Sequence, residues 1–279
     1  MTAVPDTTDT VQIRQFRAPF EAVLPSSGMN VFAVEGLPEI EPGDDIAAMI
    51  ADRVDLDSGD IVCVASTIVS KAEGRQADLA EFSAGEQAER IAEQVGDLAG
   101  EQKDPRFAQA VIEESEELLL EVPIMLAVTR FGHITINAGI DRSNIPDADL
   151  LLLPEDPTAS AQRLHEELGV PVIVTDTSGR PFRHGQRGVA IGWAGIPAAR
   201  DWRGKEDRDG KELEATVQAV VDELAAAANL VTGEGAGGKP VAVVRDWDFG
   251  EFDGSDDLFR EESEDLIRPA LEEYSHAGD

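Results

Sequence analysis

The amino-acid sequence predicts an α+β fold with mixed, largely antiparallel sheets and packing helices. Short apolar segments typical of strands alternate with amphipathic segments typical of helices. Some strand segments follow each other closely enough to form a hairpin, whereas others are separated by a helix that would cross over the sheet. This combination favours α+β over a doubly wound parallel sheet. With 279 residues, 42% of them hydrophobic, the chain can bury one large core or two moderate ones.

Local signals place each element in the first half of the chain. The turn Glu41-Pro42-Gly43-Asp44 precedes a helix, and a repeating apolar face that includes Phe107 and Val111 predicts another. The predicted elements are a strand at 31–34, a helix near 44–54, a strand near 61–69, and helices near 84–97 and 105–119.

The second half follows the same logic. Asp156-Pro157-Thr158 is a helix start signal, and the glycine cluster 233–238 ends a long alanine-rich helix. The predicted elements are strands near 125–130, 133–138 and 171–175, a helix near 158–168 before the last of these, a strand near 188–193, a helix near 210–230 and a strand at 240–245.

The two ends of the chain differ from this pattern. Residues 1–28 are rich in Thr, Pro and Ser and precede a second methionine, Met29. They form an irregular leader that is either disordered or an upstream start that the cell does not translate. The main domain is expected at 29–250. Residues 251–279 are an acidic segment with helical pieces, including 261–268, that packs on this domain or extends it.

Acidic residues dominate the charge of the chain. Asp and Glu number 56 against 23 Lys and Arg, which gives a formal net charge of −33 spread over the whole sequence. Such self-repulsion opposes a compact fold in dilute buffer, but molar salt reduces the Debye length to about 3 Å. The composition therefore predicts a protein of a halophile. It also excludes nucleic acid as a partner, because phosphates need cationic neutralisation.

Cysteine usage and hydropathy limit the cellular setting. The one cysteine, Cys63, lies in an apolar strand segment and is expected to be a buried small hydrophobe. A single cysteine supports neither a disulfide framework nor a cysteine-ligated metal. No apolar stretch approaches a membrane span, and no signal core is present near the N-terminus. The sequence therefore predicts a cytoplasmic protein without a membrane partner.

Two aspartates follow predicted strands and are the first candidates for chemistry. Asp141 comes after the segment 134–140, and Asp176 comes after 171–175. Short oxygen donors flank both aspartates: Ser143, Asn144, Thr175, Thr177 and Ser178. Hard cations such as Mg²⁺ and Mn²⁺ prefer such oxygen ligands. The competing interpretation is a pair of aspartates that cap turns.

The segment from Gly233 to Pro240 resembles a Walker A loop in spacing, but Pro240 stands where the motif requires Ser or Thr. The predicted order is also reversed, because the loop follows a helix and precedes a strand. We therefore reject a P-loop. Glycine-rich backbone amides can still bind phosphate, and Glu234 among them could reach a phosphate-bound metal. A plain connector that closes the helix is the alternative.

Two further segments carry positive charge. Ser66–Lys71 combines hydroxyls with a lysine at the predicted end of a strand, which suits phosphate contacts; a solvated lysine is the alternative. Arg180, Arg183 and Arg187 form a basic patch that suits an anionic substrate or, alternatively, salt bridges to the acidic surface. The histidines lack metal-ligand spacing, and no nucleophile elbow supports covalent hydrolase chemistry.

Taken in order, several segments resemble the coenzyme F-420:L-glutamate ligase family, in its haloarchaeal form. The matching segments are Val34–Ile40, Ala65–Gly74, Asn137–Asn144, Thr175–Arg183 and the glycine-rich loop around Glu234. Each is weak alone, but five in the right order are specific. The resemblance covers about 30–250.

The resemblance implies an enzyme that uses GTP to add L-glutamate in γ-linkage to the deazaflavin coenzyme precursor, through an acyl phosphate, with release of GDP and phosphate. It also implies an intertwined homodimer, two divalent cations (Mg²⁺ or Mn²⁺) and stimulation by K⁺. The alternative is a two-metal, nucleotide-dependent transferase or phosphatase acting on another anionic substrate. A non-catalytic nucleotide-binding scaffold is a third possibility.

The family pattern also implies roles for individual residues. Asp141 and Asp176 match the catalytic ligands of one metal, and Thr177 and Glu234 match those of the second. The residues implied to bind GTP are Leu37, Pro38, Glu39, Ile40, Ser66, Thr67, Lys71, Asn144, Thr232, Gly233, Glu234, Gly235, Ala236, Gly237, Gly238 and Lys239. The family often has an apolar residue at the position of Glu39, and the leader has no counterpart. Neither departure affects the implied metal ligands.

Overall fold

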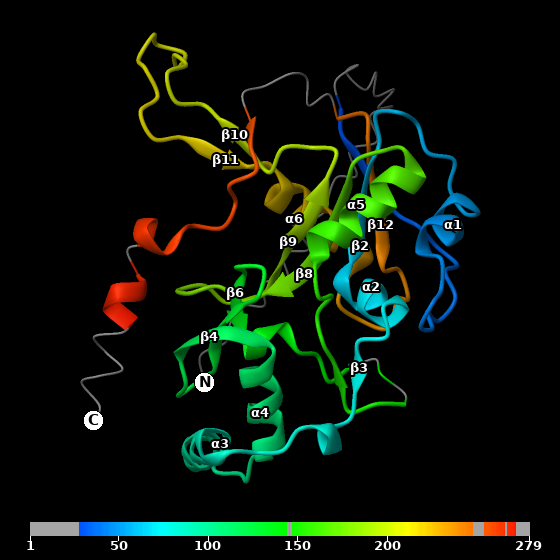
Figure 1. Ribbon diagram of the computed structural model, residues 1–279. Helices are drawn as coiled ribbons and strands as arrows, with labels where there is room; N and C mark the ends of the chain where they lie inside the picture. The colour runs from blue at the N-terminus through cyan, green and yellow to red at the C-terminus, as the bar shows by residue number, and fades with distance from the viewer. Residues whose placement is uncertain (1–27, 144, 146, 248–253, 266, 272–279) are drawn as a thin grey trace, which may run out of the picture.

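The computed structural model describes residues 28–143, 145, 147–247, 254–265 and 267–271 (Figure 1). The predicted leader, apart from Gly28, lies outside this range. The centre of the molecule is a five-stranded sheet. Its strands, in spatial order, are β1 (Asn30–Ala33), β12 (Val241–Arg245), β2 (Ile61–Ala65), β8 (Val172–Ser178) and β9 (Arg187–Ala194). Only β2 and β8 pair in parallel, which confirms the predicted mixed, largely antiparallel α+β fold.

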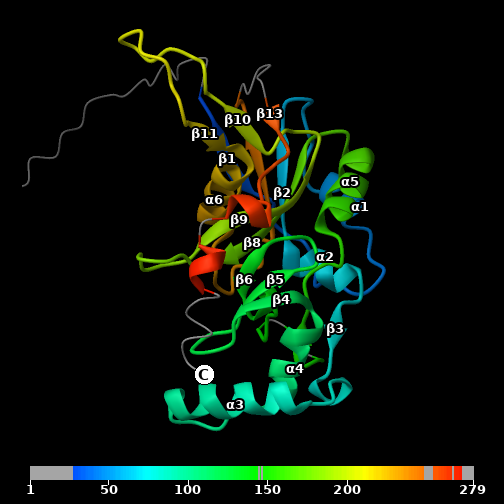
Figure 2. The same ribbon diagram turned by 60° about the vertical axis from the view of Figure 1, so that its left-hand side comes forward.

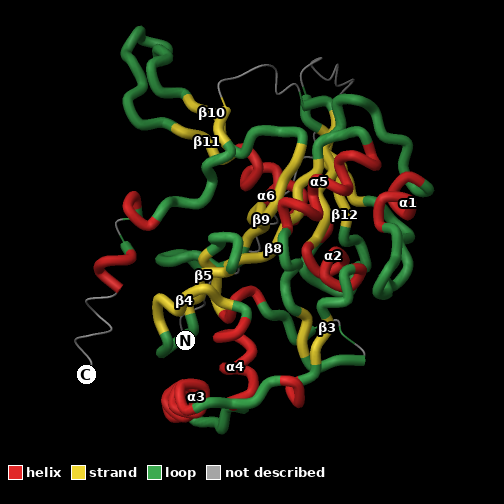
Figure 3. The backbone as a smooth tube through the Cα atoms, viewed as in Figure 1, coloured by secondary structure: helices red, strands yellow, loops and turns green. Residues whose placement is uncertain are grey.

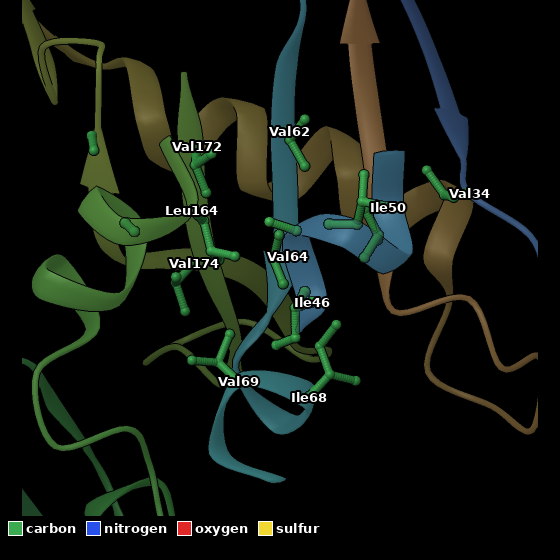
Figure 4. Packing of buried hydrophobic residues seen from close by; sticks show 14 of the residues in the cluster. Val34, Ile46, Ile50, Val62, Val64, Ile68, Val69, Leu164, Val172 and Val174 are labelled. Carbon is green, nitrogen blue, oxygen red and sulfur yellow. The ribbon is translucent and has the colours of Figure 1, made fainter. Parts of the chain in front are cut away.

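Helices cover both faces of the central sheet. On one face lie α1 (Ile46–Ala51), α2 (Ser66–Ala72) and α5 (Pro157–Leu168), and on the other lies α6 (Val220–Thr232). Side chains of β2 alternate between the two cores: Val62 and Val64 face the first group of helices (Figure 4), whereas Cys63 packs with α6. Because both faces are buried, β2 is apolar throughout.

Two glycines in β9 allow helices to approach this strand closely from both sides. A Cβ atom added to Gly188 would lie 2.4 Å from the carbonyl oxygen of Ala225 in α6. A Cβ atom at Gly192 would lie 2.3 Å from the carbonyl carbon of Pro157, in the first turn of α5. Both neighbours are backbone atoms, so β9 can be packed between these helices only without side chains at the two positions.

A small lobe, residues 76–151, lies beyond one end of the central sheet (Figures 2 and 3). It contains β3 (Gln76–Ala77), α3 (Glu86–Ala99), α4 (Pro105–Glu113), β4 (Ser115–Leu120), β5 (Leu126–Thr129), β6 (Ile134–Ile136) and β7 (Leu150–Leu151). Strands β4, β5 and β6 form an antiparallel sheet, and β3 pairs with β7. The lobe has its own core, with Ile91 and Val111 fully buried in it.

A third small sheet joins the C-terminal segment to the body. It consists of β11 (Val217–Ala219), β10 (Ala199–Asp201) and β13 (Gly254–Ser255). Beyond β13, the indole Nε1 of Trp193 donates to Oδ1 of Asp256 at 3.1 Å, and the ring of Phe259 packs edge-on against Trp193. Within the described residues, no helix is both long and apolar enough to span a bilayer.

Two predicted elements end earlier than expected. The strand predicted at 61–69 stops at Ala65, and Ser66 begins helix α2. The run containing Ile68 and Val69 was ambiguous because short apolar runs fit either structure, and here the helix buries both side chains against the sheet. The helix predicted at 105–119 ends at Glu113, and 115–120 is strand β4, because pairing with β5 overrides helical periodicity.

The helix predicted at 210–230 begins only at Val220. Residues 202–216 instead form a turn-rich arm, in which the amide of Leu213 donates to the carbonyl of Lys205 at 2.8 Å. At its tip, the amide of Gly210 donates to the carbonyl of Asp207 at 3.0 Å. The Asp209-Gly210 dipeptide is a hairpin signal that marks this turn in the sequence.

His133 is an unusual group in this fold because it is buried and uncharged. It is 8% exposed, its Nε2 has no hydrogen-bond partner in the described structure, and Phe131 and Phe259 pack on its ring. Burial, assisted by the nearby charge of Arg187, lowers the pKa of His133 from 6.5 to about 4. His133 is therefore protonated at a lower pH in the folded protein than in the unfolded chain.

This shift predicts a pH dependence of stability. The contribution of a neutral His133 is fully present above pH 6.5, its unfolded pKa, and is lost as the pH falls toward about 4. Between pH 7 and pH 4, the free energy of unfolding of the native protein should fall by about 3 kcal/mol more than that of His133→Phe. Urea titrations at several pH values in molar KCl measure this difference. Parallel curves for the two proteins would contradict it, and His184→Gln, at an exposed site, is the control.

Candidate active site

The topology of the central sheet brings the predicted site segments to one edge. Strand β1 is antiparallel to β12, which is antiparallel to β2, and β2 is parallel to β8. The carboxyl ends of β1, β2 and β8 therefore meet the amino ends of β12 and β9. At this edge the amide of Val34 donates to the carbonyl of Val241, and that of Ala65 to the carbonyl of Pro240, each at 2.8 Å. The segments at or next to these strand ends are 35–40, 66–71, 176–178, 179–187 and 232–240.

Three carboxylates interact at this edge. Asp176 lies near the end of β8, within the strand and not after it as predicted, and its Oδ1 accepts a hydrogen bond from the hydroxyl of Ser66 at 3.2 Å. Burial, followed by the negative charges of Asp141 and Glu234, raises the pKa of Asp176 to about 6 against the opposing hydrogen bonds from Ser66 and the amide of Thr177. The three side chains come from β8, the small lobe and the glycine-rich loop. Only the tertiary structure brings them together.

Thr177 connects β8 to the glycine-rich loop. Its hydroxyl donates to Oε1 of Glu234 at 3.0 Å, and the amide nitrogen of Asn229 donates to the same oxygen at 2.6 Å. Thr177 and Glu234, predicted as ligands of one metal, are therefore in direct contact. Asn229 was not predicted; its only signal is its place in the last turn of α6, close to Glu234.

Asp141 is held at the border of the small lobe. Its backbone forms a bridge with Leu151, with hydrogen bonds of 2.9 and 3.0 Å in the two directions. Its Oδ1 accepts from the amides of Arg142 and Ser143, at 2.7 and 2.8 Å. The carboxylate thus caps a turn, as the competing interpretation stated, and is also close enough to influence Asp176. Asn144 lies outside the described residues.

The donor set fits small hard cations shared with a phosphate ligand. Among the described residues, no three His, Cys, Asp or Glu side chains are grouped to hold one metal ion. The expected arrangement needs only two protein ligands for each of two ions: Asp141 with Asp176, and Thr177 with Glu234. Mg²⁺ is commonly held by one or two carboxylates together with substrate phosphates. The pKa of Asp176 is raised first by burial and then by the charges of Asp141 and Glu234, and a bound cation would favour the charged carboxylate against both effects.

The two lysines at this edge are both paired with glutamates of one segment. Lys71, in the last turn of α2 and only 6% exposed, forms an ion pair with Glu39. Lys239 pairs with Glu35 at 2.7 Å. The segment 35–40 is anchored by Ile40, which is buried, and by Leu37, which packs on the same core. An anionic ligand that binds either lysine therefore competes with a glutamate for the ammonium group.

The glycine-rich loop has the surroundings predicted for it. It follows helix α6 and precedes strand β12, which confirms that it is not a P-loop. Gly233 and Gly238 have φ values of +70° and +61°, which residues other than glycine rarely adopt. Residues 233–238 are exposed. The amides of Gly233 and Gly237 donate to the carbonyls of Asn229 and Gly235, at 2.9 and 2.7 Å. The loop lies at the same edge as Thr177 and Lys239.

Comparison with known proteins identifies the class as a ligase family. A family model described as F420-0:Gamma-glutamyl ligase matches residues 36–246, which include Asp141, Asp176, Thr177 and Glu234. The chain belongs to the F420-0:Gamma-glutamyl ligase family.

Individual relatives cover nearly all of the chain. A protein of Natronomonas pharaonis named Coenzyme F420:L-glutamate ligase is 68% identical over 250 residues, covering 90% of this chain and 99% of its own length. Proteins of the same name are 64% identical in Haloarcula marismortui, covering 90% of this chain and all of the relative, and 47% identical in Archaeoglobus fulgidus, covering 87% and 98%. The haloarchaeal relatives agree with the expectation drawn from the acidic composition.

Proposed function

We propose that this protein is a GTP-dependent ligase that adds L-glutamate in γ-linkage to the deazaflavin coenzyme precursor. The observation that carries the proposal is the grouping of Asp141, Asp176 and Glu234 at one sheet edge, in a chain of this family. The names of its relatives supply the acceptor and the amino acid. The glycine-rich loop and the two lysines at the same sheet edge support a nucleoside triphosphate as the second ligand.

The proposed reaction has two steps. A carboxylate of the acceptor attacks the γ-phosphorus of GTP, the bond to the β-phosphate oxygen breaks, and GDP leaves. The glutamate amine then attacks the acyl phosphate, phosphate leaves with the bonding electron pair, and the amine loses a proton as the amide forms. Bound divalent cations would offset the charge that develops on the phosphate oxygens.

The residues of this chain bind and orient the reactants in that scheme. Asp141 and Asp176 would hold one cation, and Thr177 and Glu234 the other. Lys71 and Lys239 would exchange their glutamate partners for phosphate oxygens. The amides of Glu234, Gly235, Ala236 and Gly238 would hold the triphosphate in line with the attacking carboxylate. The segments 37–40 and 66–67 would contact the rest of the nucleotide.

The proposal is tested with the full-length protein in molar KCl, supplied with GTP, Mn²⁺, L-glutamate and the deazaflavin precursor. We expect a product heavier by one or more glutamyl residues in mass spectrometry, and GDP release that requires both acceptor and glutamate. GDP release without either substrate would instead favour the transferase or phosphatase. Absence of turnover would favour a nucleotide-binding scaffold.

We also propose the homodimer, the cytoplasmic location and the stimulation by K⁺ that the family resemblance implies. Sedimentation equilibrium in molar KCl tests the dimer, and replacement of KCl by NaCl at equal ionic strength tests a specific effect of K⁺ on the rate. Equal rates in the two salts would contradict that effect.

A further inference from the structure

The loop that joins β8 to β9 is the most basic part of a strongly acidic protein. Residues 179–187 contain three arginines and a histidine but no Asp or Glu, although the whole chain has 56 acidic residues. Within the described residues, no ion pair or hydrogen bond engages the side chains of Arg180 and Arg183, and both residues are exposed. Their guanidinium groups are therefore available to an anionic ligand.

Phe182, between these arginines, is unfavourable in two respects. Its side chain is fully exposed, with a relative accessibility of 105%, so the hydrophobic ring contacts only water. Its φ angle is +62°, a left-handed conformation that is rare for a bulky residue. Local strain of this kind is often found in segments that bind ligands. An exposed aromatic ring with an arginine on either side in the sequence suits a planar, anionic aromatic molecule, through stacking and charge pairing.

The place of the loop at the sheet edge indicates which substrate it would meet. The segments proposed for the nucleotide follow β1 and β2 or precede β12, and these strands lie on one side of β8, the strand that carries Asp176. The segment 179–187 consists of the loop between β8 and β9 and the first residue of β9, which lies on the opposite side of β8, and it begins three residues after Asp176. Figures 1 and 2 show it projecting from the ends of these strands. If the nucleotide occupies the side of β1, β12 and β2, the β9 side of β8 is available to the molecule that receives the phosphoryl group.

We propose that the loop 179–187 is the acceptor-binding element, in which Phe182 stacks on the planar ring system of the acceptor and Arg180 and Arg183 bind its anionic side chain. This inference rests on the proposed function. The connection through β8 would then align the acceptor carboxylate with the phosphate held beside Asp176 and Thr177.

The test measures acceptor binding separately from chemistry. Fluorescence titration of the deazaflavin precursor, without GTP, compares the native protein with Phe182→Ala, Phe182→Trp and Arg183→Ala, and with Arg208→Ala as a control on the exposed arm. We expect Phe182→Ala to weaken acceptor binding about tenfold, with the affinity for GTP and Mn²⁺ unchanged and Phe182→Trp close to the native protein. Arg183→Ala should weaken binding more at low than at high KCl, because salt screens charge but not stacking.

The inference would be overturned by unchanged acceptor affinity in Phe182→Ala, by a loss of GTP affinity with acceptor affinity unchanged, or by dissociation of an oligomer with acceptor affinity retained. Failure of the native protein to bind the acceptor would do the same. Failure of the proposed function gives a different result. In that case the native protein would still bind the acceptor through Phe182 but would add no glutamate to it.

Discussion

Replacement of Asp176 by Asn should reduce glutamate addition by about 10³-fold or more while the protein remains folded. Loss of one anionic metal ligand removes several kcal/mol of stabilisation from the phosphoryl transfer, and about 4 kcal/mol corresponds to this factor in rate. The amide keeps the shape of the side chain and its contact with the hydroxyl of Ser66. Product formation in molar KCl with GTP and Mn²⁺ measures the effect. Full activity in Asp176→Asn would refute the metal role.

The same substitution should stabilise the metal-free protein. The pKa of Asp176 is raised from 3.8 to about 6, so the folded state binds this proton more tightly than the unfolded chain. The contribution to stability is greatest below pH 3.8, falls as the pH rises to about 6, and stays low above that. At pH 8 in EDTA, Asp176→Asn should gain up to about 3 kcal/mol of unfolding free energy. Asp209→Asn, on the exposed arm, is the control. Equal stability of the two variants would contradict the shift.

Replacement of Gly192 by Ala should destabilise the protein by about 3 kcal/mol or prevent folding. The new methyl group would lie 2.3 Å from the carbonyl carbon of Pro157 and 2.6 Å from the amide nitrogen of Thr158. Both are backbone atoms in the first turn of α5, and this helix is packed on the sheet that carries Asp176. Relief therefore requires the helix to move away from β9.

Urea unfolding in molar KCl measures this loss, since urea leaves the ionic strength unchanged. Gly59→Ala is the matched control, because a Cβ atom there would meet nothing within 4 Å. Neither glycine has a positive φ, so the two variants differ mainly in the steric contact. If Gly192→Ala were as stable as Gly59→Ala, the close packing of β9 against α5 would be wrong.

Local patterns were sufficient for most of the scaffold. Apolar strands and capped helices depend on residues that are close in the sequence, and the acidic character depends on composition alone. All three can therefore be predicted without a structure. The helix α5 begins where the Asp156-Pro157 signal predicted, and the loop at 233–238 lies between a helix and a strand as expected. Errors arose where the local signal was ambiguous, as at Ser66, or where strand pairing decided the outcome, as at 115–120.

For the site, the sequence by itself determined which residue types were available, and the family resemblance assigned roles to them. The sequence did not show that Asp141, 35 positions before Asp176, helps to raise the pKa of Asp176. Nor did it show that Glu39 pairs with Lys71 and Glu35 with Lys239. Those facts depend on strand order and direction, because parallel β2 and β8 with antiparallel β12 and β9 bring distant strand ends to one edge. Side-chain distances across that edge, and the pKa shifts they cause, exist only once the sheet has formed.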